Sequence, residues 1–434
     1  MRAAAVALAL VGRLALANSH DTFGDGPRAA AMAGAMVAEA NDYTASFYNP
    51  ALLTRAESAN FGLGFSWYRL QGDVTSKDPA RQLDCAYCSS PDAVAFHLGF
   101  VFPLGGKLKN HVSLGVGLLV PATRLVRLLA PDPEQPYWIT YNSNPERLLL
   151  HAGVGIKITE WFSLGVGIQA FADLLGEGAQ VQVDLFSKQV TRRSVDSSLV
   201  TRASPVFSVA ITPIKQLRFG VTFRWERYLE YSIPASVDLK GVGTLGFNIN
   251  GITHYTPHEL EFGAAWDPIP QLTIALSGTW MNWSRAPSPY MGLTVDLSGD
   301  TLKALGLDGA LDVSSPTQPP GFADTLSGRL GVEYRITDRF AARGGAFFRP
   351  TMVPKQDAPG TNILDGPTVG LTAGLGFNFS DPLEIFSRPV TIDLATQGQF
   401  VLARETNKES TDVTPSYSYS GRAYGLTIAV RYDF

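Results

Sequence analysis

The chain ends in Tyr424-Gly-Leu-Thr-Ile-Ala-Val-Arg-Tyr-Asp-Phe434, a stretch that alternates apolar and polar side chains and stops on an aromatic residue. In a β-strand, successive side chains point to opposite faces, so the even-numbered residues share one face and the odd-numbered ones, such as Thr427 and Arg431, share the other. An apolar face with an aromatic residue at each end suits lipid, and a face of small, polar and charged residues suits a wet lumen. A strand of a soluble sandwich shows the same alternation, so the rest of the chain must decide.

The composition favours a membrane barrel over membrane-spanning helices. The chain has 434 residues and lacks the run of about 18 or more apolar residues that a transmembrane helix needs. Barrel strands give only half of their residues to lipid, so the hydropathy of the whole chain stays near neutral. The net charge is −4, and the charged residues are scattered along the sequence without a basic cluster. Nucleic acid is therefore not an expected partner.

The amino terminus indicates export. Arg2 is followed by an apolar run over residues 3–11 and by Ala15-Leu16-Ala17, which has the small-x-small form of a cleavage site. Arg13 interrupts the apolar stretch, which is a departure from a regular signal. We expect residues 1–17 to be a signal peptide, with the mature chain starting near Asn18.

The two cysteines of the chain, Cys85 and Cys88, are three positions apart. Such a spacing is found in redox pairs, in half of a zinc site and in local disulfides. A second cysteine pair and a β-α-β context are both missing from the sequence, so we expect a disulfide that closes a small outer loop in an oxidising envelope. We predict neither a metal nor a cofactor.

From residue 60 onward, alternating segments of about ten residues are separated by connections that are short and long in turn, which is typical of an outer-membrane barrel. We therefore predict an all-β fold, a transmembrane antiparallel barrel over residues 59–434, of about fourteen strands. The strand centres are Phe65, Leu98, Val116, Gly153, Gly167, Ser208, Phe223, Phe262, Leu276, Leu330, Ala346, Leu375, Leu394 and Ile428.

The connections predict the orientation of the barrel, because outer-membrane barrels have short turns in the periplasm and long loops outside. The short connections are 105–106, 159–160, 213–215, 267–270, 337–338 and 380–387. The long connections are 72–91, 128–144, 176–198, 241–253, 287–320, 350–366 and 405–418. This rhythm places the carboxyl terminus in the periplasm.

Charged residues fall on one face of the predicted strands. On the lipid face at mid-depth each arginine would cost roughly 2–4 kcal/mol, so this face must line the lumen. There the charges could hold a carboxylate ligand or the amino-terminal segment, and we expect most of them to pair with one another. The set comprises Arg147, Lys157, Arg218, Arg224, Glu226, Arg329, Glu333, Arg335 and Arg343.

Residues 18–58 precede the first strand and are rich in Ala and Gly. Such a segment is either a periplasmic extension or a small helical plug inside the barrel, for which a barrel of this size has room. Residues 27–40 are compatible with a helix, since Pro27 suits a first helical turn.

The segment from Gly34 to Ala51 ends in Phe47-Tyr48-Asn49-Pro50-Ala51. It resembles the amino-terminal plug of the FadL-like outer-membrane transporters of long-chain fatty acids and aromatic hydrocarbons, whose hallmark is the Asn-Pro-Ala triplet. Three further segments resemble the barrel of this family, so the resemblance covers essentially the whole mature chain. These segments are 257–284, 327–345 and 348–365.

The resemblance implies a fourteen-stranded barrel closed by a plug, in which a hydrophobic ligand is captured outside, held in an inner pocket and released sideways through the wall. Long-chain fatty acids are the ligands we favour, and aromatic hydrocarbons or other lipid-like molecules are the alternative. Lateral release is physically reasonable, because passage through a polar lumen would expose the apolar surface of the ligand to water, at a free-energy cost of about 25 cal/mol per Å². Pro121 lacks an amide donor and is a candidate for a kink that opens the wall, although it could equally end its strand at the outer rim.

The plug carries the remaining candidate site residues. Asn49, with Pro50 and Ala51, is expected to cap or turn the plug chain and to set the closed gate, since Asn before Pro is held extended. Phe23, Phe47 and Tyr48 are candidate ligand contacts, and their alternative role is to pack the plug against the wall.

Two other classes of barrel protein would need features that this sequence lacks or does not need. A lipid-acting barrel enzyme would need a nucleophile and a base at one rim, but the six histidines come without a serine-nucleophile signature, so we predict no catalysis. A general water-filled porin would not need a plug segment before its first strand. We predict a monomer in the bacterial outer membrane whose partners are a hydrophobic ligand, membrane lipid and the barrel assembly machinery, the last through the strand that ends at Phe434.

Overall fold

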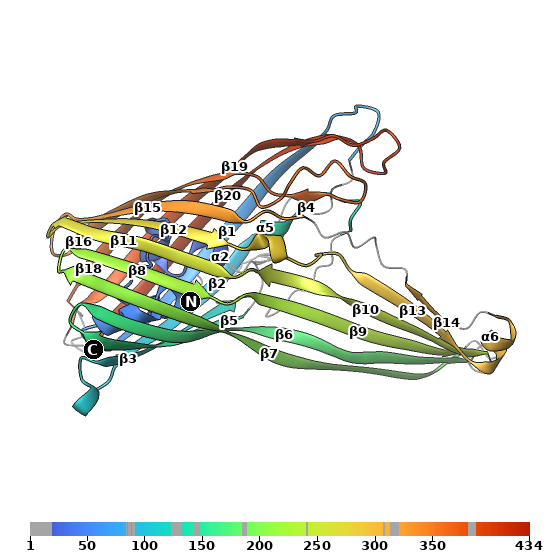
Figure 1. Ribbon diagram of the computed structural model, residues 1–434, viewed down its shortest axis with the longest axis horizontal. Helices are drawn as coiled ribbons and strands as arrows, with labels where there is room; N and C mark the ends of the chain where they lie inside the picture. Colours follow the sequence, from blue (N-terminus) through green and yellow to red (C-terminus); the bar gives the residue numbers. More distant parts are fainter. Residues whose placement is uncertain are drawn as a thin grey trace, which may run out of the picture.

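The computed structural model describes residues 20–83, 85, 88, 92–122, 132–142, 148–184, 189–239, 242–306, 309–312, 321–380 and 388–434. Its main feature is a closed barrel of 14 antiparallel strands (Figure 1). The last strand pairs with the first over its whole length, and the amide of Phe434 donates to the carbonyl of Ala59 at 2.8 Å, which completes the closure. The predicted signal peptide, residues 1–17, lies outside the described residues.

Each predicted strand centre falls inside a barrel strand, so the predicted number and order of strands are confirmed. The barrel strands are β1 (Asn60–Ser76), β2 (Ala93–Pro103), β3 (Val112–Pro121), β5 (Leu149–Thr159), β6 (Phe162–Asp184), β7 (Gln189–Ile214), β8 (Leu217–Arg224), β11 (Glu259–Ile269), β12 (Leu272–Met281), β15 (Thr325–Arg335), β16 (Phe340–Arg349), β18 (Thr368–Phe379), β19 (Val390–Thr406) and β20 (Tyr417–Asp433).

The burial of strand β20 follows the predicted alternation. Leu426 and Ile428 are 43% and 41% exposed, whereas Thr427 and Ala429 on the other face are 3% and 7% exposed. The exposed apolar residues face outward, as a surface in contact with lipid requires, and the small residues face the lumen.

The predicted long connections are not all loops: 176–198, 241–253 and 287–320 contain long stretches of strand, and 128–144 and 350–366 each contain a strand of two residues. Strands β6 and β7 stay paired far beyond the barrel rim, and the register of this ladder shifts once between Gly176 and Gly178, as at a β-bulge. Beside them lie β9 (Arg227–Leu239), β10 (Gly243–Thr256), β13 (Gly292–Ser298) and β14 (Gly309–Asp312), with the helix α6 (Asp300–Ala304) at the tip. We call these outer segments the arm; it projects from the barrel end opposite the short connections (Figure 1).

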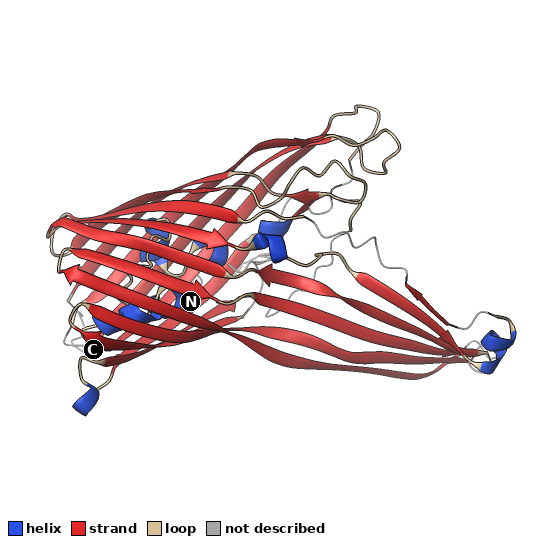
Figure 2. Cartoon of the chain, viewed as in Figure 1, coloured by secondary structure: helices blue, strands red, loops and turns tan. Residues whose placement is uncertain are grey.

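The amino-terminal segment lies inside the barrel, as a plug rather than a periplasmic extension (Figure 2). Its helical turns are α2 (His20–Phe23), α3 (Pro27–Ala31), α4 (Ala45–Tyr48) and η1 (Pro50–Arg55). Residues 27–40 are compatible with a helix by sequence, but helix α3 ends at Ala31, because Ala33 and Gly34 have positive φ angles of 54° and 76°. An α-helix cannot continue through such a backbone.

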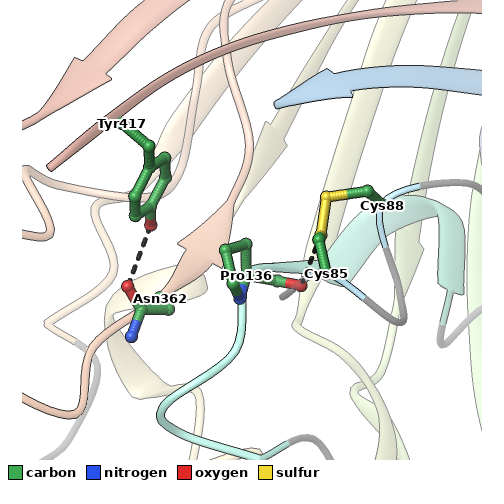
Figure 3. The surroundings of a disulfide bond; sticks show 5 residues. All are labelled: Cys85, Cys88, Pro136, Asn362 and Tyr417. Atoms are coloured by element: carbon green, nitrogen blue, oxygen red, sulfur yellow. Dashed lines mark hydrogen bonds between the residues drawn. A yellow bond between two sulfur atoms is a disulfide. The ribbon is translucent and has the colours of Figure 1, made fainter. Parts of the chain in front are cut away.

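The outer loops fold over the barrel mouth. The short strands β4 (Tyr137–Trp138) and β17 (Ile363–Leu364) pair in parallel, and α5 (Ile139–Asn142) follows β4 directly. Trp283 of η3 (Trp283–Arg285) belongs to the same apolar cluster as Ile139 and Ile363. Cys85 and Cys88 form the expected disulfide, and the Cys85 Sγ lies 3.7 Å from the carbonyl oxygen of Pro136 (Figure 3). A further short helix, η2 (Gly106–Leu108), lies in a short connection. None of the helices in the described part of the chain is long and apolar enough to cross a membrane.

Candidate functional site

A cavity lies in the lumen between the plug and the outer loops. Its empty volume is about 1000 Å³, which includes space open to solvent. Apolar and aromatic side chains come from the plug, from two strands and from the loops, and polar groups lie between them. Such a mixture fits a ligand that is mainly apolar. The apolar lining includes Phe47, Met281, Trp283, Phe347 and Met352.

The structure brings two of the three predicted contact residues to this cavity. Phe47 and Tyr48 line it, whereas Phe23 stacks on Tyr68 of β1 with ring centroids 4.2 Å apart. Phe23 is buried, and its neighbours Thr22 and Gly24 line the cavity instead. Ligand contact by Phe47 and Tyr48 stays a prediction, and packing of the plug is the role that the geometry gives to Phe23.

The plug separates the outer cavity from a second one on the periplasmic side. The second cavity has an empty volume of about 1580 Å³ and is more polar, with Arg55, Lys157 and Lys215 among its lining residues. The two cavities have no lining residue in common. A ligand that crosses the lumen along its axis must therefore displace part of the plug.

The Asn49-Pro50-Ala51 triplet joins the plug to the barrel wall. Asn49 has an extended backbone, and its side-chain oxygen accepts a hydrogen bond from the amide of Ala51 at 3.0 Å. Its side-chain amide donates to the carbonyls of Val37 in the plug and Val209 in β7, at 2.7 and 3.1 Å. This is the capping geometry expected for Asn before Pro, and the role of the triplet in gating stays a prediction.

Glycines on the lumen face let the plug backbone touch the wall. A Cβ on Gly165 would clash with the chain at Pro50 and Ala51, and one on Gly220 would clash with the carbonyl of Val37. Such close backbone approach is a reason for glycine inside a strand. From the sequence alone, the glycines that contact the plug cannot be distinguished from the other glycines of the strands.

A network of charges ties the plug to the wall. Glu39 of the plug accepts from Arg28 at 2.8 Å, from Arg218 of β8 at 2.5 Å and from Arg55 at 3.4 Å. Burial by itself would raise the pKa of the Glu39 carboxyl, but the guanidinium groups of Arg55, Arg28 and Arg218 hold it below its ordinary value. The network continues from Arg28 to Glu333 at 2.9 Å. Its further links are Arg218 to Asp267, and Glu333 to Asp393 through Arg343.

The expectation that the lumen charges pair mostly with one another is therefore only partly correct. Glu333 and Arg343 do pair, at 2.6 Å, but Arg218 binds Glu39 of the plug as well as Asp267 of β11, neither of which belongs to this set. Arg335 is exposed at the periplasmic end, and Arg147 lies outside the described residues. The sequence analysis did not identify Arg28 and Glu39 as residues that hold the plug, because their spacing matches no motif.

The cavity contains two arginines whose partners differ. Arg224 binds Glu259 at 2.6 Å and Glu261 at 3.0 Å, and it also donates to the plug carbonyls of Phe47 and Tyr48. Arg329 donates to the carbonyl of Ala33 at 3.0 Å and lies over the Phe347 ring, and no described carboxylate lies within ion-pair distance of it. Arg329 thus has N–H donors left for an anionic group.

A second buried polar cluster links the plug to β2 and β5. The carboxylate of Asp25 lies 3.1 Å from Nδ1 of His97 and 3.2 Å from Nε2 of His151. Ser66 lies 2.7 Å from the other nitrogen of His97, a chain of groups that resembles a hydrolytic triad. All these side chains are at most 2% exposed, and Ser66 also donates to Thr427, so the cluster joins the plug to the barrel wall.

Pro121 is the last residue of β3, opposite Ala95 of β2. The described pairs of β3 with β2 and β5 run without a register shift, and the pairing with β5 ends at Leu119. Pro121 therefore lies at the outer end of its strand, and whether it opens the wall stays a prediction.

Known proteins are similar to this chain over most of its length. The sequence profile of the family "Outer membrane protein transport protein (OMPP1/FadL/TodX)" matches residues 15–434. Alkane uptake protein A of Marinobacter nauticus is 23% identical over 93% of this chain and 88% of its own length. Among solved structures, a Pseudomonas aeruginosa FadL homologue has a TM-score of 0.61 at 15% identity, over 98% of this chain and 100% of that one. The P. putida toluene transporter TodX has a TM-score of 0.59 at 16% identity, over 95% and 99%.

Proposed function

The chain belongs to the outer membrane protein transport protein family (OMPP1/FadL/TodX), and we propose that it is a passive channel for long-chain hydrophobic molecules whose release is gated by the plug. As a family member it is a bacterial outer-membrane transporter of hydrophobic substrates. The proposal adds that the substrates have long hydrocarbon chains, that transport is passive and that the plug is the gate. It also keeps lateral release through the wall as the exit.

One observation carries this proposal: a lumen cavity with an aromatic and apolar lining is closed toward the periplasm by a plug that is tied to the wall. Phe47 and Tyr48 form part of the cavity floor and belong to the same short segment as Asn49. A ligand that contacts Phe47 and Tyr48 can therefore displace the segment that contains Asn49, the capping residue of the plug.

Fatty acids are the substrates we favour, and alkanes, aromatic hydrocarbons or other lipid-like molecules are the alternative; Arg329 distinguishes a fatty acid from an uncharged hydrocarbon. A fatty acid needs a cation for its carboxylate, and a charge-assisted hydrogen bond to Arg329 would supply it. An alkane needs none, and the M. nauticus relative is named for alkane uptake. Arg329→Gln should slow uptake of a labelled fatty acid and leave uptake of a labelled alkane unchanged if fatty acids are the substrates. Equal rates for both substrates in the variant and the wild type would favour the hydrocarbon class.

Deletion of residues 49–51 tests the gate. The barrel ladder does not depend on the plug, so we expect the deleted protein to insert and to remain heat-modifiable on gels. Uptake of labelled palmitate and hexadecane should be lost at matched surface expression. Wild-type rates in the deletion variant would refute the gate.

A further inference from the structure

The second cavity, on the periplasmic side of the plug, is lined by more cations than carboxylates. Four cationic side chains and two carboxylates belong to its lining. The two carboxylates, Glu57 and Glu160, are exposed. Three of the cationic side chains are less exposed, at 28%, 24% and 5%, and they belong to Arg55, Lys157 and Arg218. The wall of the cavity is therefore positive, whereas its carboxylates extend into water.

Of the three arginines around Glu39, Arg55 has the least compensation from carboxylates. Its Nη1 lies 3.4 Å from Glu39, which binds the other two arginines at 2.8 and 2.5 Å. Those two arginines each have a further partner, Glu333 or Asp267, whereas Arg55 forms no second ion pair within the described chain. The Nε and Nη2 groups of Arg55 donate no hydrogen bond to a described residue. These donors remain available for an anion in the cavity.

The two lysines of the cavity belong to the barrel wall. Lys157 of β5 pairs with Glu160 at 3.4 Å, and the Glu160 side chain is 90% exposed. An ion pair so open to water contributes little, so Lys157 can exchange this partner for another carboxylate. Lys215 lies in the turn between β7 and β8 and forms no ion pair with a described carboxylate. Its backbone carbonyl accepts from Arg218 at 3.5 Å, which joins this turn to the ion network of the plug.

The three cations with little compensation come from three separate elements, namely η1 of the plug, strand β5 and the turn between β7 and β8. An anion with a single charge would use one or two of them. A flexible chain with several carboxylates can contact all three at once and binds more tightly for that reason. The lining is mainly polar, so the cavity does not suit the hydrophobic molecule that the channel transports. Charge and position together favour an acidic polypeptide from the periplasm.

We propose that the second cavity binds an acidic segment of a periplasmic protein, whose carboxylates bridge Arg55 of the plug to Lys157 and Lys215 of the wall. A ligand that needs both sides of this bridge binds the docked plug in preference to the undocked one, and it stabilises the docked state by mass action. The partner therefore holds the plug closed from the periplasmic side. This inference concerns a partner rather than the transported molecule, so it goes beyond the proposed function and does not depend on it.

Peptide binding to the full-length protein in detergent micelles tests the site. Fluorescence anisotropy would be measured with a labelled peptide of alternating aspartate and serine, and with a second peptide that has asparagine in place of aspartate. We expect only the aspartate peptide to bind. Lys157→Gln with Lys215→Gln should weaken its binding by roughly tenfold, because two charge-assisted contacts are lost. Lys107→Gln with Lys109→Gln is the matched control, since it removes the same charge from the same barrel end outside the cavity, and it should bind as the wild type does.

Equal binding of the two peptides would refute the site. An equal loss of affinity in the two double variants would refute it as well, because the attraction would then belong to the whole barrel end. Displacement of the aspartate peptide by an equimolar amount of citrate would assign the cavity to small carboxylates and overturn the polypeptide partner.

Hydrogen exchange tests the bridge between plug and wall. The amide of Ala56, at the end of η1, donates to the carbonyl of Leu53 at 3.2 Å. Saturating aspartate peptide should slow its exchange several-fold in the wild type, and should leave it unchanged in Lys157→Gln with Lys215→Gln. If the peptide binds the wild type but leaves the exchange of this amide unchanged, the partner does not hold the plug.

Discussion

Replacement of Glu39 by glutamine should release the plug, because this carboxylate binds three guanidinium groups at once. The side chains of Arg28, Arg218 and Glu39 are only 8%, 5% and 5% exposed. The connected network balances four arginines against four carboxylates, so the variant leaves one uncompensated positive charge inside the barrel. Removal of one partner of a buried ion pair costs about 3–5 kcal/mol. At about 1.4 kcal/mol for each factor of ten, the undocked plug should become roughly a hundred to a few thousand times more populated.

Hydrogen exchange followed by mass spectrometry measures this population. The amide of Asn49, bonded to the carbonyl of Ala45 at 2.9 Å, and the other plug amides should exchange faster by that factor, while barrel amides stay protected. Glu57→Gln, in an exposed position on the same segment, is the matched control and should leave plug exchange unchanged. If plug amides of Glu39→Gln exchange at the wild-type rate, the ion network does not hold the plug.

Three further predictions follow from the same contacts. Gly165→Val should displace the plug from the wall, since a Cβ there clashes with Pro50 and Ala51. The matched control is Gly328→Val, where the added Cβ meets open space. Hydrogen exchange of the plug amides should be faster in Gly165→Val than in the control, and equal rates would refute the contact. Pro121→Val, which restores an amide donor, should slow uptake of apolar substrates without changing small-solute leakage, and an unchanged uptake rate would remove Pro121 from the exit. Plug docking should also depend on pH: because the pKa of Glu39 is lowered from 4.5, its contribution is complete above that value and is lost as the pH falls below it. Protease sensitivity of the plug should rise only below that pH, and a transition near neutrality would contradict this assignment.

The strand pattern was predictable from the sequence because barrel strands alternate with a period of two along their whole length, as β20 does. The arm was not, because Gly176, Gly178 and the polar residues of β9 and β10 resemble loop residues, and only pairing between strands shows that the segments are extended. The triplet at Asn49 was identified by family resemblance. The anchors Arg28, Glu39, Asp25, His97 and His151 were missed, because they are far apart in sequence and meet only when the plug enters the barrel.

The most direct test of the account is whether substrate passes through the lumen cavity. Uptake of labelled hexadecane and palmitate would be measured in bacteria that express the wild type, Ser327→Trp or Leu326→Trp at matched surface levels. Ser327 lines the cavity, whereas its neighbour Leu326 is 59% exposed on the outer face of the same strand, so the two variants place one bulky ring on opposite sides of the wall. We predict that Ser327→Trp abolishes uptake and that Leu326→Trp retains it. Wild-type uptake in Ser327→Trp would contradict transport through this cavity.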